Sequence, residues 1–243
     1  MWLDIEEYIR VPSKSKLTPP TLVVFCKRPK LYQGKQRIAE TIGAEKTLLL
    51  AQAFLGCALE DARQWLGSVV LSPSCEDDLQ WAQGLDIDAQ VFPQQQGNLG
   101  ERLMQVDRDL REQGHRHILF IGTDAPALSA PHYQSAAHAF NRAEVVLSAA
   151  NDGGVTMMGS TGGWPDIADL PWSTEQLGNA LRQRCQHYQL QVEYILPSYD
   201  VDVEADLRRL ADDLHNDQRP ARQLLLEQLL ALNLEERLIC TNR

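Results

Sequence analysis

Residues 117–126, HILFIGTDAP, join a buried strand to an acid that follows its end. The run 117–121 is short, continuous and apolar, which is typical of a strand buried on both faces. Asp124 comes three residues later, before Pro126. Ligands of open parallel sheets bind beyond the carboxyl ends of the strands, so this placement favours a functional carboxylate. A simple turn aspartate before a proline is the alternative.

Similar short runs alternate with segments of helical periodicity along the chain. The predicted strands are 21–26, 68–71, 89–92, 117–121, 144–148 and 191–196. The predicted helices are 44–66, 76–83, 101–112, 131–141 and 173–187, and a capping box of Ser173 and Gln176 opens the last one. Strict alternation predicts an α/β fold of three layers, α/β/α, around a mainly parallel sheet.

Both ends of the chain look like additions to this core. We expect an N-terminal extension over 1–18, one nucleotide-binding domain over 19–212, and a C-terminal helical extension over 213–243. Residues 220–237 carry leucines at helical spacing. A lone amphipathic helix usually covers its own domain, so we expect it to pack on the domain rather than form a dimer surface.

The composition excludes several classes of protein. The 243 residues are 44% apolar and 23% charged, as in ordinary globular domains, with a formal net charge of −10. An acidic chain is a poor nonspecific ligand for nucleic acids or anionic membranes. No apolar run approaches the roughly 20 residues of a membrane helix. Five widely spaced cysteines, together with an N-terminus unlike a secretory signal, lead us to expect a reduced, cytoplasmic protein without membrane insertion.

The positive charge is concentrated in one place. Residues 27–37 hold five basic side chains and no acid, so the other 232 residues carry a net charge of −15. Lys27, Lys35 and Arg37 follow the first strand, where basic side chains can face phosphates, and Gly34 allows close backbone approach. No Walker motif is present. Residues 27–37 are therefore equally consistent with a solvated basic loop and with a site for a small anionic ligand.

Further polar motifs follow other strands. Asp200 and Asp202 are two apart, so in an extended segment they point the same way and repel unless a cation or proton lies between them. Asp202 could alternatively cap the following helix, and both roles are compatible. Asp152 lies in the turn Asn-Asp-Gly-Gly, and residues 96–102, QGNLGER, enter a helix whose N–H groups could meet an anion.

These pieces occur together and in order. The motifs are Phe25-x-Lys27-x-Pro29 with Lys35-x-Arg37-Ile38, then QGNLGERL at 96–103, IGTDAPAL at 121–128, NDGG at 151–154, PWST at 171–174 and DVDVEADL at 200–207. Over residues 21–210 the chain resembles the GT-A-fold, glycosyltransferase-like nucleotide-diphospho-sugar transferases of the radical-SAM- and selenium-associated type. The guanylyltransferases of molybdenum-cofactor and 2-phospholactate metabolism are more distant relatives.

The resemblance implies a GT-A-like fold and a set of site residues. Mg²⁺ or Mn²⁺ would bind Asp124 and Asp202, and Asp152 and Asp200 would be the catalytic acids. The nucleotide and its phosphates would meet the following residues: Lys27, Lys35, Arg37, Gly97, Asn98, Gly100, Arg102 and Thr123. The partners would be a nucleotide or nucleotide-sugar and a small-molecule acceptor, with the protein a monomer or homodimer.

The sequence also departs from the family pattern. Tyr32 replaces a glycine, Gln36 a threonine, Asn98 an acid, and Val155 the aromatic residue after the Gly-Gly pair. These changes indicate either a different substrate or lost activity. Three hypotheses follow: metal-dependent transfer from a nucleoside-diphosphate-activated donor, nucleotidyl transfer from a nucleoside triphosphate to a phosphorylated acceptor, and an inactive nucleotide-binding or scaffold protein.

Overall fold

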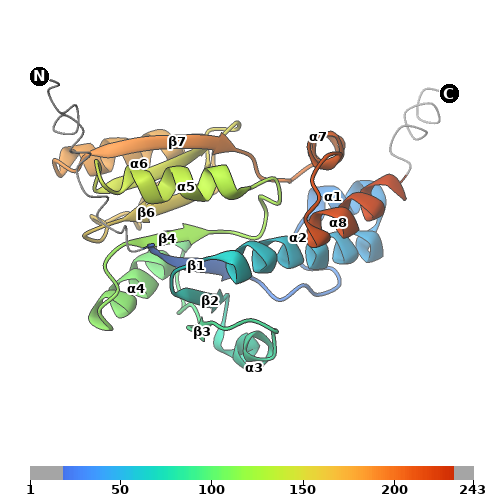
Figure 1. The fold of residues 1–243 in the computed structure, drawn as a ribbon, viewed down its shortest axis with the longest axis horizontal. Coiled ribbons are helices and arrows are strands. Elements are labelled where there is room, and N and C mark those ends of the chain that lie inside the picture. Colours follow the sequence, from blue (N-terminus) through green and yellow to red (C-terminus); the bar gives the residue numbers. More distant parts are fainter. Residues whose placement is uncertain (1–18, 233–243) are drawn as a thin grey trace, which may run out of the picture.

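A seven-stranded sheet forms the centre of the computed structural model, which describes residues 19–232 (Figure 1). The strands run in the order β3-β2-β1-β4-β6-β5-β7. Their bounds are β1 Thr21–Cys26, β2 Val69–Pro73, β3 Gln90–Val91, β4 Ile118–Ile121, β5 Val145–Ala150, β6 Val155–Ser160 and β7 Val192–Ser198. The predicted α/β class is confirmed.

One strand runs against the others. Strand β6 pairs antiparallel with both β4 and β5, whereas the remaining pairs are parallel. Strand β6 is not predicted from the sequence, because Val-Thr-Met-Met-Gly-Ser shows neither strict alternation nor a continuous β-branched run. It follows β5 through a tight turn at residues 151–154, and this hairpin places the NDGG motif at the carboxyl end of β5.

Helices cover both faces of the sheet. The helices are α1 Gln36–Ile42, α2 Ala44–Gln64, α3 Leu79–Gln83, α4 Leu99–Glu112, α5 Ala130–Ala139, α6 Leu177–His187, α7 Glu204–Leu214 and α8 Pro220–Leu230, with a 3-10 turn at Glu76–Asp78. Side chains of alternate strand residues divide between the faces. Leu22 and Val24 pack with α2 and α5, whereas Val23 packs with α4 and α6.

The C-terminal helices form a separate cluster with α1 and α2. Leucines of α7 and α8 bury against Leu50, Phe54 and Cys57 of α2, and Figure 1 shows α1, α7 and α8 gathered at one end of the molecule. The leucine-rich segment therefore packs within the chain up to residue 232. Residues 1–18 and 233–243, which include the rest of that segment and Cys240, lie outside the described residues.

Arg222 of α8 anchors this packing. Its guanidinium is 1% exposed and bonds Glu60 and Asp61 of α2 at 2.9 and 2.6 Å. It also donates to the carbonyls of Pro126 and Leu128 at 3.2 Å each. Removing one member of such a buried network leaves uncompensated charge, so α8 is an integral part of the described fold.

The predicted capping box of α6 is wrong, and so is the alternative interpretation of Asp202 as a helix cap. Helix α6 begins at Leu177, and Ser173 precedes it with a φ of 60°, so no capping box forms there. Asp202 does not cap α7, because the carboxylate of Asp206 accepts the N–H groups of Asp202 and Val203 instead. Asp202 is thereby left available for another contact.

The helices within residues 19–232 include none with the length and apolarity that a membrane crossing requires.

Candidate functional site

A cavity of about 680 Å³ opens where the parallel strands end. Its floor comes from the ends of β1 and β4 and from β6, which contributes residues 155–158. The loop after β1, the start of α4 and the segment after β7 form its walls. The cavity therefore lies at the edge of the sheet that the position of Asp124 predicts.

An acidic cluster lies at one end of this cavity. Asp124 follows β4, and Asp200 and Asp202 follow β7, so the acids come from strands far apart in the sequence. A backbone hydrogen bond of 2.9 Å joins the Val201 N–H to the Asp124 carbonyl. This bond holds the two acidic segments side by side.

The ammonium of Lys35 lies between two of these acids. Its Nζ is 3.0 Å from Asp124 Oδ2 and 2.8 Å from Asp202 Oδ1, and the lysine side chain is only 10% exposed. Burial alone would lower the pKa of Lys35, but the two carboxylates outweigh burial and raise it. Lys35 is therefore a permanent cation at the point where Asp124 and Asp202 converge.

The third acid, Asp200, has a strongly raised pKa. Burial raises the pKa of Asp200 to about 7, and the charge of Asp124 adds to the shift while Lys35 opposes it. A carboxyl group with such a pKa exchanges protons near neutral pH. An additional positive charge at this end of the cavity would lower that pKa again.

The loop after β1 supplies the basic wall. Lys27, Arg28 and Lys35 all line the cavity. Lys30 instead pairs with Asp78 at 2.9 Å. The loop turns back through left-handed residues, with φ values of 61° at Tyr32 and 49° at Lys35. That turn directs Lys35 inward toward the acids.

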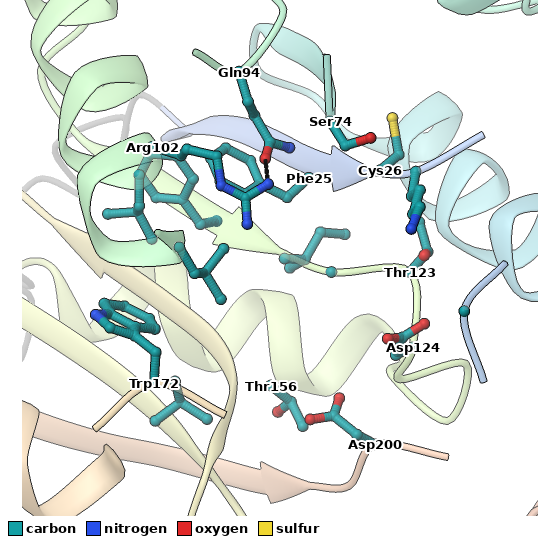
Figure 2. Close-up of a pocket in the computed structure, with 18 of the residues that line it drawn as sticks. Phe25, Cys26, Ser74, Gln94, Arg102, Thr123, Asp124, Thr156, Trp172 and Asp200 are labelled. Carbon is teal, nitrogen blue, oxygen red and sulfur yellow. Dashed lines mark hydrogen bonds between the residues drawn. The ribbon is translucent and has the colours of Figure 1, made fainter. Parts of the chain in front are cut away.

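Arg102 lies at the opposite end from the acids. Figure 2 shows Arg102 and Trp172 on one side of the cavity, with Thr123, Asp124 and Asp200 on the other. Arg102 Nη1 donates to Gln94 Oε1 at 3.0 Å, the dashed line in Figure 2.

Aromatic side chains line the space around Arg102. Phe25 and Phe120 meet edge to face with their ring centres 5.4 Å apart. The indole N–H of Trp172 donates to the Ile167 carbonyl at 2.8 Å, which fixes the ring beside the cavity. Gly100 allows this packing, because a Cβ there would lie 2.3 Å from Trp172 Nε1.

Part of the chain matches a known family. Residues 57–174 match the sequence model of the family described as "Uncharacterized protein conserved in bacteria (DUF2064)". No protein of curated function matches the chain.

Solved structures agree on the fold. A protein from Desulfovibrio desulfuricans G20, provisionally assigned as a nucleotide-diphospho-sugar transferase, superposes with a TM-score of 0.80 at 21% identity, over 89% of this chain and 97% of that one. A mycobacterial homologue of Rv0371c from strain JC1 gives 0.51 at 17% identity, over 82% and 98%. A cytidylyltransferase from Leptospira borgpetersenii gives 0.51 at 12%, over 86% and 93%. At these identities the matches show the fold alone, and at that level they confirm the resemblance that the motifs indicated.

Seven of the twelve predicted site residues line the cavity: Lys27, Lys35, Arg102, Thr123, Asp124, Asp200 and Asp202.

The other five predicted site residues do not line it. Arg37 is exposed on α1, and Gly100 packs against Trp172. Asn98 caps α4 by accepting the Glu101 N–H at 3.0 Å, and Gly97 precedes it with a φ of 128°. Asp152 lines a separate open depression between the β5–β6 turn and the start of α6. Its Oδ1 accepts the Gly154 N–H at 3.0 Å.

Several residues that line the cavity are not predicted from the sequence. Gln94, Ser74, Thr156 and Trp172 all line it, although only Trp172 belongs to a motif that was noted. Gln94 follows β3, so its position after a strand could have identified it. Thr156 could not be placed without β6.

Proposed function

We propose that the protein is a metal-dependent transferase that uses a nucleoside-diphosphate-activated donor. The observation that carries this proposal is the arrangement of charge in one cavity, where Lys27, Arg28 and Lys35 face the acids Asp124, Asp200 and Asp202. Basic side chains suit a diphosphate, and carboxylates suit a hard divalent cation.

The donor atoms fit Mg²⁺ or Mn²⁺. Asp124 and Asp202 converge on the Lys35 ammonium, and this arrangement supports a cation site between the two carboxylates. In proteins Mg²⁺ often takes only one or two carboxylates and completes its shell with substrate phosphates and water. In the described part of the chain no set of three or more His, Cys, Asp or Glu side chains has metal-binding geometry, so the phosphates would supply the remaining ligands. The bound metal would neutralise charge that develops on the leaving diphosphate.

The residues of this chain divide the remaining tasks. Lys27 and Arg28 would hold the diphosphate oxygens at the mouth of the cavity. The bond between the transferred group and the diphosphate oxygen breaks, and a bond to the acceptor oxygen forms. Asp200 lines the cavity, whereas Asp152 lies outside it, so Asp200 is the better placed acid to accept the proton of the acceptor hydroxyl.

A calorimetric titration tests this proposal. Nucleoside diphosphates and nucleotide-sugars are titrated into the protein with and without Mn²⁺. We expect binding that depends on the metal and falls in Asp124→Asn. Flat titrations across the panel with both metals would refute the proposal.

Nucleotidyl transfer is the second candidate, and the fold shared with the Leptospira cytidylyltransferase favours it. It would release pyrophosphate from a nucleoside triphosphate, whereas the first reaction releases a nucleoside diphosphate. A coupled assay for pyrophosphate separates the two. Binding without any turnover would instead indicate the inactive relative that the departures at Tyr32, Asn98 and Val155 suggest.

A further inference from the structure

We propose that the Arg102 end of the cavity binds a second oxyanion, a carboxylate or phosphate carried by the acceptor. This inference rests on the proposed function and names the chemical class of the acceptor, a small organic acid or phosphate ester. The evidence is the charge state, the orientation and the surroundings of one guanidinium.

Arg102 has no acidic partner among residues 19–232. Its Nη1 donates to Gln94 Oε1 at 3.0 Å and its Nε to the Asn98 carbonyl at 3.4 Å, and both acceptors are neutral. A guanidinium carries five N–H donors, so most of them stay available to a ligand in the cavity. A charge that is partly removed from water and unpaired is unfavourable, and an oxyanion would relieve that cost.

The nearest acid in the sequence is turned away. Glu101 uses its carboxylate in the α4 capping box, where Oε2 accepts the Asn98 N–H at 2.7 Å. Leu99, the first residue of α4, lines the cavity beside Arg102. The Glu101 carboxylate thus offsets the positive end of this 14-residue helix, and Arg102 is the cation that α4 presents to the cavity.

Gln94 aims the guanidinium without neutralising it. Gln94 is only 6% exposed, and its side-chain Nε2 donates to the Ser72 carbonyl at 2.8 Å. That bond turns Oε1 toward Arg102. A glutamate at this position would have filled the anion site from within the protein, whereas the neutral amide keeps the positive charge for a ligand.

The Arg102 end of the cavity suits the acceptor better than it suits the nucleotide donor. In the proposed function Lys27 and Arg28 hold the diphosphate, and Figure 2 shows Arg102 across the cavity from Asp124. Phe25, Phe120 and Trp172 offer apolar surface for the body of a small acid. A neutral nucleobase at this place would leave the Arg102 charge unpaired.

Calorimetry with two small anions tests the site. Phenyl phosphate and benzoate are titrated into the protein, free and loaded with Mn²⁺ and the tightest-binding nucleoside diphosphate, with benzamide as the neutral control. We expect both Arg102→Met and Gln94→Glu to weaken binding of at least one anion about tenfold or more. Arg108→Met makes the same charge change on α4 outside the cavity and should leave the affinity unchanged. Thermal melts establish that each variant is folded.

The arms of the experiment separate the possible outcomes. Preference for phenyl phosphate or for benzoate identifies a phosphorylated or a carboxylate acceptor. The inference is overturned if benzamide binds as tightly as the anions, if Arg102→Met matches Arg108→Met, or if Arg102→Met weakens the nucleotide as much as the probe. Failure of every nucleotide to bind the wild-type protein refutes the proposed function instead, and titration of the free protein still tests Arg102.

Discussion

Replacing Lys35 with methionine removes the ammonium that joins Asp124 and Asp202 while it keeps an unbranched apolar side chain. We expect the variant to bind Mn²⁺ about 30-fold more tightly than the wild-type protein when no nucleotide is present. The reason is competition, because the lysine ammonium occupies the point on which both carboxylates converge.

The magnitude follows from the geometry. The side chains of Asp124 and Asp202 are 52% and 50% exposed, so the dielectric of water is the conservative choice. With Mn²⁺ at the point between the acids and the ammonium displaced by about 4 Å, the two repel by about 2 kcal/mol in water, because two unit charges at that distance interact by about 1 kcal/mol. Each 1.4 kcal/mol is about tenfold in affinity, which gives about 30-fold. The carboxylates raise the pKa of Lys35, so the competing charge persists above neutral pH.

The assay is a titration of free Mn²⁺ by electron paramagnetic resonance at fixed ionic strength. Lys27→Met is the matched control, because Lys27 lines the same cavity and forms no ion pair with another described residue. Lys27→Met makes the same change in net charge but leaves the Lys35 ammonium between Asp124 and Asp202. An equal gain in affinity in both variants, or none in Lys35→Met, would refute the competition.

Three further predictions concern stability. Because the pKa of Asp200 is about 7 when folded and near 4 when unfolded, its contribution to the unfolding free energy of the metal-free protein falls as pH rises through that range and levels off above 7. The melting temperature of Asp200→Asn relative to wild type should therefore rise from pH 4 to 8 in EDTA, and a constant difference would contradict this. Arg222→Met should lose about 3–5 kcal/mol in urea unfolding, because it leaves buried carboxylates unpaired, and a loss below 1 kcal/mol would count against the network. Gly100→Ala should lose about 1–3 kcal/mol and alter the fluorescence of Trp172, whereas Gly162→Ala, which meets nothing within 4 Å, should do neither.

The strands that the sequence predicted well are those buried on both faces. The predictions for 21–26 and 117–121 match β1 and β4 closely, because a short continuous apolar run is typical of a buried strand. Strand β6 was missed for a tertiary reason. Gly159 is required there because a Cβ would lie 2.6 Å from the Phe140 ring and 2.7 Å from the Ile118 carbonyl. That crowding involves residues of two other elements, which periodicity cannot show.

The same distinction holds for the site, where local sequence patterns predict some residues and contacts between distant segments determine others. Asp124 and Lys35 were placed at the mouth of the sheet from their positions after strands, and both line the cavity. The start of α1 at Gln36 was not predicted, and it places Arg37 on an exposed helix surface. The contact of Lys35 with Asp202 spans 167 residues, so no local pattern could reveal it.

The C-terminal helices connect these observations, because they hold the acidic end of the cavity in place. Val201, between Asp200 and Asp202, is fully buried in the cluster formed with α7 and α8, and its N–H bonds the Asp124 carbonyl. Arg222 of α8 holds the carbonyls of two residues in the loop that follows Asp124. Both acidic segments are thus fixed from the same side by helices beyond the core sheet. Helix α8, which lies in the expected C-terminal extension, therefore supports the spacing of the carboxylates, and a variant that loosens α8 should weaken Mn²⁺ binding as well as stability.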